Sequence, residues 1–275
     1  MSGAGVCSVH NHSTLSDGKN TPAQMARAAY EAGVRFFGLS DHSHTSMSYD
    51  EGFVLPRDMR EYKDVLSALK TEYEGKMEVL CGLEWDSLSD ADYEGFDYWI
   101  GSVHSLRAPS GRCYGLDSSP ESLRECLNEM FRGDAAALAE AYYAEVARVA
   151  AQRPTILAHF DIITKFNERE SVFCESDPRC RAAALEALRA ADPASTLLEI
   201  NTGAMSRGWR SAPYPEPFLL EEWRSLGGRI IITGDSHSAD SVVYGYDIAA
   251  QAAKAAGFKS VAVLTLGGVR EAAPD

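Results

Sequence analysis

The sequence has no apolar run long enough to cross a membrane, and it does not begin with a basic stretch followed by an apolar one. No membrane partner is therefore expected. The six cysteines form no Cys-x-x-Cys pair and several stand in apolar surroundings, which predicts reduced core residues in a cytoplasmic protein. No repeat, linker or low-complexity segment is present, so a single domain is expected over residues 1–275.

Basic residues are scarce, with 26 Lys and Arg against 40 Asp and Glu and a formal charge of −14. This charge argues against long nucleic acid as a partner, because the phosphate backbone would be repelled. A small phosphorylated substrate would need a local positive centre, which bound metal ions can supply. No Gly-x-Ser-x-Gly elbow and no phosphate-cradling P-loop occurs.

Strand and helix patterns alternate along the whole chain. Thr21-Pro22 and Ser119-Pro120 have the composition of helix starts, whereas residues 105–119 are expected to be an irregular insertion and 45–55 a polar loop that acts as a lid or substrate wall. The predicted strands are 6–9, 34–40, 77–83, 98–103, 155–158, 196–200 and 229–233, with 260–264 as a closing strand or extended tail.

Seven strand-helix units predict an α/β fold, either a nearly closed parallel barrel or an open doubly wound sheet. The barrel is favoured because polar clusters follow strand after strand, and only a barrel brings all those strand ends to one mouth. All seven histidines lie at or just past a predicted strand end: His10, His12, His42, His44, His104, His159 and His237.

Three acidic residues, Asp41, Glu84 and Asp235, occupy equivalent positions, and Asp17 follows the first strand next to Gly18. Any one of them is more simply explained as a capping residue, but their joint placement with the imidazoles indicates a metal site. Imidazoles mixed with carboxylates suit zinc, manganese or iron, and the number of candidate ligands predicts about two to three divalent ions. Glu84 is a candidate bridging ligand.

Several motifs together resemble those of the polymerase-and-histidinol-phosphatase (PHP) superfamily. They are His10-x-His12…Asp17-Gly18, Ser40-Asp41-His42, Gly101-Ser102-Val103-His104 and Asp235-x-His237. The stretches 159–166 (HFDIITKF), 199–203 (EINTG) and Tyr214-Pro215 are similar to the histidinol-phosphatase branch in particular. The resemblance covers nearly the whole chain and implies a distorted (β/α)7 TIM-like barrel with a trinuclear metal centre that hydrolyses phosphate esters.

The same resemblance implies three neighbouring metal sites. His10, His12, Glu84 and Asp235 would hold the first ion, Glu84, His104 and His159 the second, and Asp17, His42 and His237 the third. Some relatives have His at the position of Asp17, so the third site is the weaker assignment. Asp41 would either orient a ligand imidazole or cap a turn.

The expected chemistry is direct attack on phosphorus by a hydroxide that bridges two ions. Lys165, Arg207 and Arg210 are candidate phosphate-binding cations, while Asp235 and His44 are candidates for proton transfer. L-histidinol phosphate is the substrate that the resemblance favours. Other small phosphate esters, nucleotides or oligonucleotide 3′ ends are the alternative substrates, and a metal-binding barrel without turnover is the non-enzymatic alternative.

Overall fold

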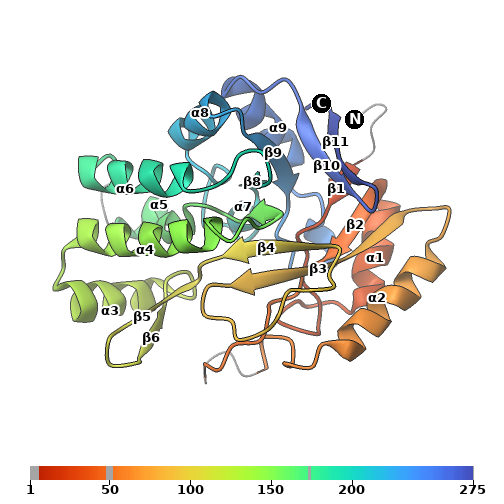
Figure 1. Cartoon of the computed structure of the whole chain (residues 1–275), viewed down its shortest axis with the longest axis horizontal. Helices are drawn as coiled ribbons and strands as arrows, with labels where there is room; N and C mark the ends of the chain where they lie inside the picture. Colours follow the sequence, from red (N-terminus) through yellow and green to blue (C-terminus); the bar gives the residue numbers. More distant parts are fainter. Residues whose placement is uncertain (1–5, 48–51, 173–174, 275) are drawn as a thin grey trace.

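The computed structural model describes residues 6–47, 52–172 and 175–274, which form a curled sheet with helices around its outside (Figure 1). The strands are β1 (Val6–Ser8), β2 (Val34–Leu39), β3 (Glu78–Asp86), β4 (Tyr98–Ser102), β5 (Ser105–Arg107), β6 (Cys113–Gly115), β7 (Ile156–Leu157), β8 (Leu197–Asn201), β9 (Arg229–Thr233), β10 (Val261–Thr265) and β11 (Gly268–Ala272).

Helices fill most of the connections between strands. They are α1 (Pro22–Glu31), α2 (Arg60–Glu72), α3 (Pro120–Phe131), α4 (Ala135–Ala150), α5 (Asn167–Glu170), α6 (Pro178–Arg189), α7 (Gly203–Ser206), α8 (Pro217–Ser225) and α9 (Tyr246–Ala255), with 3₁₀ helices η2 (Ile162–Thr164) and η3 (Ala239–Ser241). Thr21 caps α1 through its side chain and Ser119 caps α3, and in both helices proline follows the cap, as predicted.

The main sheet has the order β1-β2-β3-β4-β7-β8-β9-β10-β11, and its neighbouring strands are parallel except for β10 and β11. Strand order follows chain order throughout, whereas a doubly wound sheet would reverse direction partway. The sheet curls until the segment after β1 meets the segment after β9, where the amide of His12 donates to the carbonyl of Ser236 at 2.8 Å. The predicted distorted barrel is confirmed.

The barrel interior is packed with side chains from the strands. Its core consists of Cys7, Val9, Leu80, Tyr98, Ile100, Ile156, Ala158, Leu197, Ile231, Ala262, Val263 and Leu264. Tyr98 crosses this interior and donates its hydroxyl to the carbonyl of Val9 at 2.5 Å. Gly82 makes room for it, because a Cβ at that position would lie 2.1 Å from the tyrosine ring. This packing closes the barrel below the mouth and leaves its upper end for polar side chains.

Some predicted boundaries differ from the structure. Residues 105–119 are not irregular throughout, since β5 and β6 pair there as an antiparallel hairpin. Strand β3 runs to Asp86 rather than ending at residue 83. Of the two alternatives for residues 260–264, the closing strand is found: β10 pairs with β9, and β11 follows it in an antiparallel hairpin. The β5–β6 hairpin and β11 were not predicted, because these strands are short and lack a clear alternation.

The cysteines agree with a reduced protein. Cys7, Cys81 and Cys126 are free and buried, Cys113 is free and partly exposed, and Cys180 is buried. Cys174 lies outside the described residues. None of the helices described here is long and apolar enough to span a membrane.

Candidate metal centre

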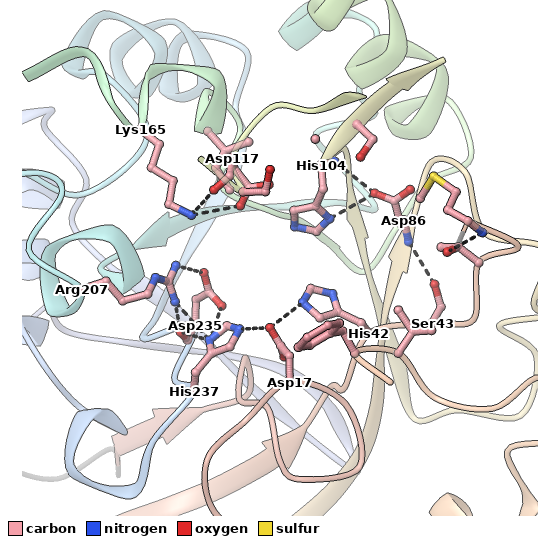
Figure 2. Close-up of a pocket in the computed structure, with 18 residues that line it drawn as sticks. Asp17, His42, Ser43, Asp86, His104, Asp117, Lys165, Arg207, Asp235 and His237 are labelled. Atoms are coloured by element: carbon pink, nitrogen blue, oxygen red, sulfur yellow. Dashed lines mark hydrogen bonds and ion pairs between the residues drawn. The ribbon is translucent and has the colours of Figure 1, made fainter. Parts of the chain in front are cut away.

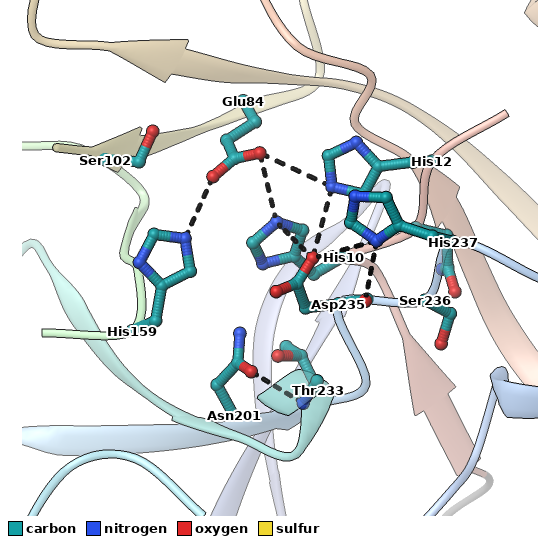
Figure 3. A network of polar contacts seen from close by, with 12 residues as sticks. His10, His12, Glu84, Ser102, His159, Asn201, Thr233, Asp235, Ser236 and His237 are labelled. Atoms are coloured by element: carbon teal, nitrogen blue, oxygen red, sulfur yellow. Dashed lines mark hydrogen bonds and ion pairs between the residues drawn. The ribbon is translucent and has the colours of Figure 1, made fainter. Parts of the chain in front are cut away.

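Side chains that follow successive strands meet at the mouth of the barrel. Figure 3 shows His10 and His12 from the end of β1, His159 from the end of β7, and Asp235 and His237 from the end of β9 around Glu84 of β3. His42 and His104 complete the ring from the ends of β2 and β4. The convergence results from the parallel sheet, which turns every strand's carboxyl end to the same side.

Glu84 lies at the centre of this group and is 1% exposed. Its two carboxylate oxygens face different histidines. Oε2 lies 3.4 Å from His10 Nε2, 3.4 Å from His12 Nε2 and 2.9 Å from His42 Nδ1, while Oε1 lies 3.3 Å from His104 Nε2 and 3.1 Å from His159 Nε2. One carboxylate in contact with five imidazoles has the geometry of a ligand shared between ions.

Asp17 supplies a second carboxylate on the pocket side. Its Oδ2 lies 2.9 Å from His237 Nε2 and 3.6 Å from His42 Nε2, and its Oδ1 lies 3.4 Å from His12 Nδ1. The following Gly18 packs against the backbone of residue 12, where a Cβ would approach within 2.6 Å. The tight turn therefore depends on glycine and aims Asp17 at the histidines.

Asp41 stabilises the same turn through hydrogen bonds from the residues before Asp17. Its carboxylate accepts hydrogen bonds from the Ser13 amide at 2.7 Å, from the Ser13 hydroxyl at 2.9 Å and from the Ser16 hydroxyl at 2.6 Å. The structure thus shows the turn-capping alternative for Asp41. An imidazole-orienting contact of Asp41 does not occur among the described residues.

Asp235 is the third carboxylate of the mouth. Its backbone is left-handed, with φ 45°, and its Oδ1 lies 3.3 Å from His12 Nε2 and 3.7 Å from His10 Nε2. Its Oδ2 accepts a hydrogen bond from Arg207 at 3.0 Å. The unusual backbone turns the side chain back into the barrel mouth, and a β-branched residue would be strained there.

Four overlapping sets of side chains bring potential ligand atoms within 4.8 Å of one another. They are His12, Asp17, His42 and His237; His10, Glu84 and His159; His10, His12 and Asp235; and His42, Glu84 and His104. Together they contain all nine predicted ligands. Their grouping differs from the predicted one in that His10 joins Glu84 and His159, while His104 joins Glu84 and His42.

The chemistry of these side chains fits divalent cations. His10 Nε2, both ring nitrogens of His12, Glu84 Oε2 and His159 Nδ1 are buried and have no hydrogen-bond partner among the described residues. A buried polar atom without a partner costs about 1–3 kcal/mol, and several in one place are rare in folded proteins. Nitrogen and carboxylate donors that converge in this way are the ligands of zinc and related ions.

The protonation equilibria of the cluster are strongly perturbed. Burial lowers the pKa of His42 and His104, but the neighbouring carboxylates, Glu84 first, together outweigh burial and raise both pKa values well above the usual imidazole range. Conversely, burial raises the pKa of Glu84 while the histidines, His42 first, hold it well below its usual range. Burial, with His237 and His42, lowers the pKa of His12 to about 3. Protons on the imidazoles thus offset the negative charge of the carboxylates in this cluster, and a bound metal ion would take the place of those protons.

Two further carboxylates orient the candidate ligands and were not predicted. Glu199 is fully buried and contacts His10 Nδ1 at 2.6 Å, and it also accepts from the His159 amide at 2.7 Å. Asp86 Oδ2 lies 3.1 Å from His104 Nδ1. Such carboxylate–imidazole contacts fix the ring and its tautomer. Glu199 lies in a motif quoted for the resemblance, but no residue pattern indicated which imidazole it meets.

A cavity of about 540 Å³ opens above these side chains (Figure 2). Asp17, His42, His104, Asp235 and His237 form its floor, and Lys165 and Arg207 line it. Arg207 donates to Asp235 and lies 3.1 Å from His237 Nδ1. Both cations were predicted for phosphate binding, and their placement beside the floor is compatible with that role.

Two of the predicted substrate or proton-transfer residues are not brought to the cavity. Arg210 is buried and donates to the Thr164 hydroxyl at 2.6 Å and to Glu216 at 2.8 Å, so it joins two loops. His44 contacts Asp90 at 2.5 Å and is absent from the cavity wall. Arg210 and His44 were predicted near the site because each follows a strand whose carboxyl end lies at the barrel mouth. In the structure, Arg210 instead pairs with Glu216 and His44 with Asp90.

Fold and site together define an α/β-barrel protein with a candidate metal-binding cup, formed by the nine candidate ligand side chains, at the carboxyl ends of its strands. A family model of the PHP domain matches residues 8–203. The chain belongs to the PHP domain family, as the motifs predicted.

Individual relatives align over most of the chain. Histidinol-phosphatase of Bacillus subtilis is 24% identical over 250 residues, which cover 83% of this chain and 91% of that protein. A protein of Deinococcus radiodurans named "Probable histidinol-phosphatase" is 27% identical over 271 residues, covering 94% of this chain and 96% of that one.

The fold is also shared with a solved structure, that of histidinol phosphate phosphatase from Lactococcus lactis complexed with zinc, L-histidinol and phosphate. The TM-score is 0.66 at 21% identity, and the match covers 96% of this chain and 98% of that chain. At this identity the likeness establishes the barrel fold.

Proposed function

We propose that this protein is a metal-dependent phosphomonoesterase whose preferred substrate is L-histidinol phosphate, which it hydrolyses to L-histidinol and phosphate. The observation that carries the proposal is the contact of Glu84 with five imidazoles beneath a cavity lined by Lys165 and Arg207. This arrangement joins ligands for several ions with cations for a phosphate group. The named activity of the aligned relatives supports the substrate.

The residues that would hold the ions are His10, His12, Asp17, His42, Glu84, His104, His159, Asp235 and His237. Zinc, manganese or iron fits this donor set, and we propose about two to three ions. When bound, such ions polarise a phosphoryl oxygen and make water a competent nucleophile near neutral pH.

Arg207 is placed to bind the phosphate group. Its guanidinium is anchored on the Asp235 carboxylate and carbonyl, at 3.0 and 3.1 Å, while the side chain is 29% exposed toward the cavity. Anchoring fixes the direction of the remaining donors, and a planar guanidinium matches two phosphate oxygens at once. We propose that Arg207 and Lys165 orient the phosphate over the metal-binding cup.

Asp235 is better suited to hold a cation than to take up a proton. Burial raises its pKa, but Arg207 and the neighbouring histidines together outweigh burial and hold the pKa well below its usual range. A carboxylate with such a low pKa is a weak base. We therefore assign Asp235 to the ligand set, and not to proton transfer.

The test is a measurement of metal content and phosphate release on protein purified without chelator. Metal-loaded protein should release phosphate from L-histidinol phosphate with a kcat/KM at least tenfold above those for glycerol phosphate and a nucleoside monophosphate. Equal turnover of all three esters would support a broad phosphoesterase instead. Tight metal binding without any turnover would support the non-enzymatic alternative.

A further inference from the structure

Four aspartates line the cavity, and three of them are already engaged by the metal-binding cup. Asp17 and Asp235 contact candidate ligand histidines, and Asp86 orients His104. Asp117 is the fourth. Its side chain is 19% exposed, its Oδ2 accepts from Lys165 at 3.1 Å, and its Oδ1 has no hydrogen-bond partner among the described residues. Asp117 therefore offers a free carboxylate oxygen at the cavity wall.

The position of Asp117 is set by the β5–β6 hairpin. Asp117 follows β6, and the amide of the preceding Leu116 donates to the carbonyl of His104 at 2.8 Å. The backbone carbonyl of Asp117 also accepts from Lys165 at 2.6 Å. Figure 2 shows Asp117 and Lys165 together on one side of the open space, across from Asp17 and His237. The β5–β6 hairpin and these two hydrogen bonds thus fix the Asp117 carboxylate at the cavity wall beside Lys165.

An ion pair at this place is complementary to a particular kind of ester. Lys165 is a cation for the phosphate, and Asp117 is an anion directly beside it. A substrate whose ammonium group is separated from the ester oxygen by two carbons carries the opposite pair of charges, with only this short linker between them. Each charge of the substrate then finds a partner when the phosphate lies over the cup, and both new contacts are charge-assisted hydrogen bonds.

We propose that Asp117 is a specificity-determining residue that binds the ammonium group of a 2-amino alcohol phosphate. The inference rests on the proposed phosphomonoesterase function and deepens it. Asp117 selects the leaving alcohol, whereas the metal-binding cup and Arg207 act on the phosphate common to all monoesters.

The experiment compares Asp117→Asn with wild-type metal-loaded protein on L-histidinol phosphate and on the same ester without the amine. The variant should lose about tenfold or more in kcat/KM on the amine-bearing ester and change less than twofold on the other. Product inhibition gives a second measurement, in which the Ki of L-histidinol rises about tenfold while the Ki of inorganic phosphate is unchanged. Asp90→Asn, which removes a carboxylate outside the cavity wall, should leave every value unchanged.

The outcomes separate this inference from the proposed function. If Asp117→Asn lowers kcat/KM equally on both esters and weakens phosphate inhibition, Asp117 only positions Lys165, and the inference is overturned while the phosphatase stands. If the wild-type protein has equal kcat/KM on the two esters, the inference is likewise overturned and the proposed phosphatase function stands. If the wild-type protein hydrolyses neither ester, the proposed function itself is wrong and the inference falls with it.

Discussion

Glu84 is the residue on which the candidate metal centre depends, because its two oxygens face histidines from four different strand ends. Replacing it by glutamine keeps the shape of the side chain but removes the charge. Glu84→Gln should lose at least half of the bound metal and lower kcat by at least a hundredfold. Elemental analysis of purified protein measures the first effect.

The matched control is Glu72→Gln, on the exposed face of α2, which should retain full metal content. A merely structural Glu84 would affect stability by about 1 kcal/mol and leave metal stoichiometry unchanged.

Glu199 is not a candidate ligand itself but contacts one, His10. Its oxygens contact the ring of His10, the amide of His159 and the hydroxyl of Thr233, at 2.6, 2.7 and 2.6 Å. Glu199→Gln should weaken metal binding by about ten- to a hundredfold, because it loses the charge that orients the His10 ring. Competition with a chromophoric chelator measures the affinity, and an unchanged affinity would limit Glu199 to supporting the fold.

Arg207 and Arg210 form a natural pair of opposite predictions. Arg207→Ala should raise KM for a phosphomonoester about tenfold or more, because a cation of the cavity wall is lost. Arg210→Ala should leave KM within about twofold and lower the free energy of unfolding by about 2–3 kcal/mol, since Arg210 is 7% exposed and bonded to Thr164 and Glu216. Steady-state kinetics and urea unfolding of both variants distinguish the two roles, and a reversed result would exchange the assignments.

At the scale of the elements, the connections after the strands do more than link helices. The loop after β7 is tied to the start of α8 by Asp161, which accepts a hydrogen bond from the Glu216 amide at 2.9 Å. Asp161 is fully buried, and its Oδ1 has no hydrogen-bond partner in the part of the chain described. Burial is the main cause that raises the pKa of Asp161 to about 7.

This shift makes stability depend on pH. The pKa of Asp161 is higher in the folded chain than the unfolded value of about 3.9, so the folded state binds more protons between about pH 4 and 7. The contribution of Asp161 to the free energy of unfolding must therefore fall as pH rises through that range. Asp161→Asn should be more stable than wild type by about 1–3 kcal/mol at pH 8, with little difference at pH 4. Urea unfolding of metal-free protein gives both values, and parallel pH profiles would contradict the prediction.

At the scale of the whole molecule, folding and metal binding are expected to be linked. Nine candidate ligands from the ends of β1, β2, β4, β7 and β9, from β3 and from the turn at Asp17 lie in one cup, so bound ions hold these elements together. Removal of metal with a chelator should lower the melting temperature. The free energy of unfolding should fall by about 3 kcal/mol for each site that was filled at a free metal concentration a hundredfold above its Kd. Differential scanning calorimetry measures the shift, and addition of zinc should reverse it. For the single domain that we propose, one cooperative transition is expected in both states.

The sequence alone determined the strand-helix alternation, the barrel class and the set of side chains at the strand ends. These are local properties or simple consequences of a parallel sheet: hydrophobic periodicity marks the strands, and parallel strands turn their carboxyl ends to one side. His10, His12 and Glu84 could therefore be assigned to one place before any distance was known.

Only the tertiary structure decided which partner each polar side chain meets. Glu199 and Asp86 reach candidate ligand histidines, Asp117 reaches Lys165, and His44 turns to Asp90, each across 18 to 189 positions of sequence. Such contacts depend on how the sheet curls and where an inserted hairpin lies, which no local pattern encodes. The chain specifies the chemical groups of the mouth through its strands, and the packing of distant segments selects which of those groups face one another.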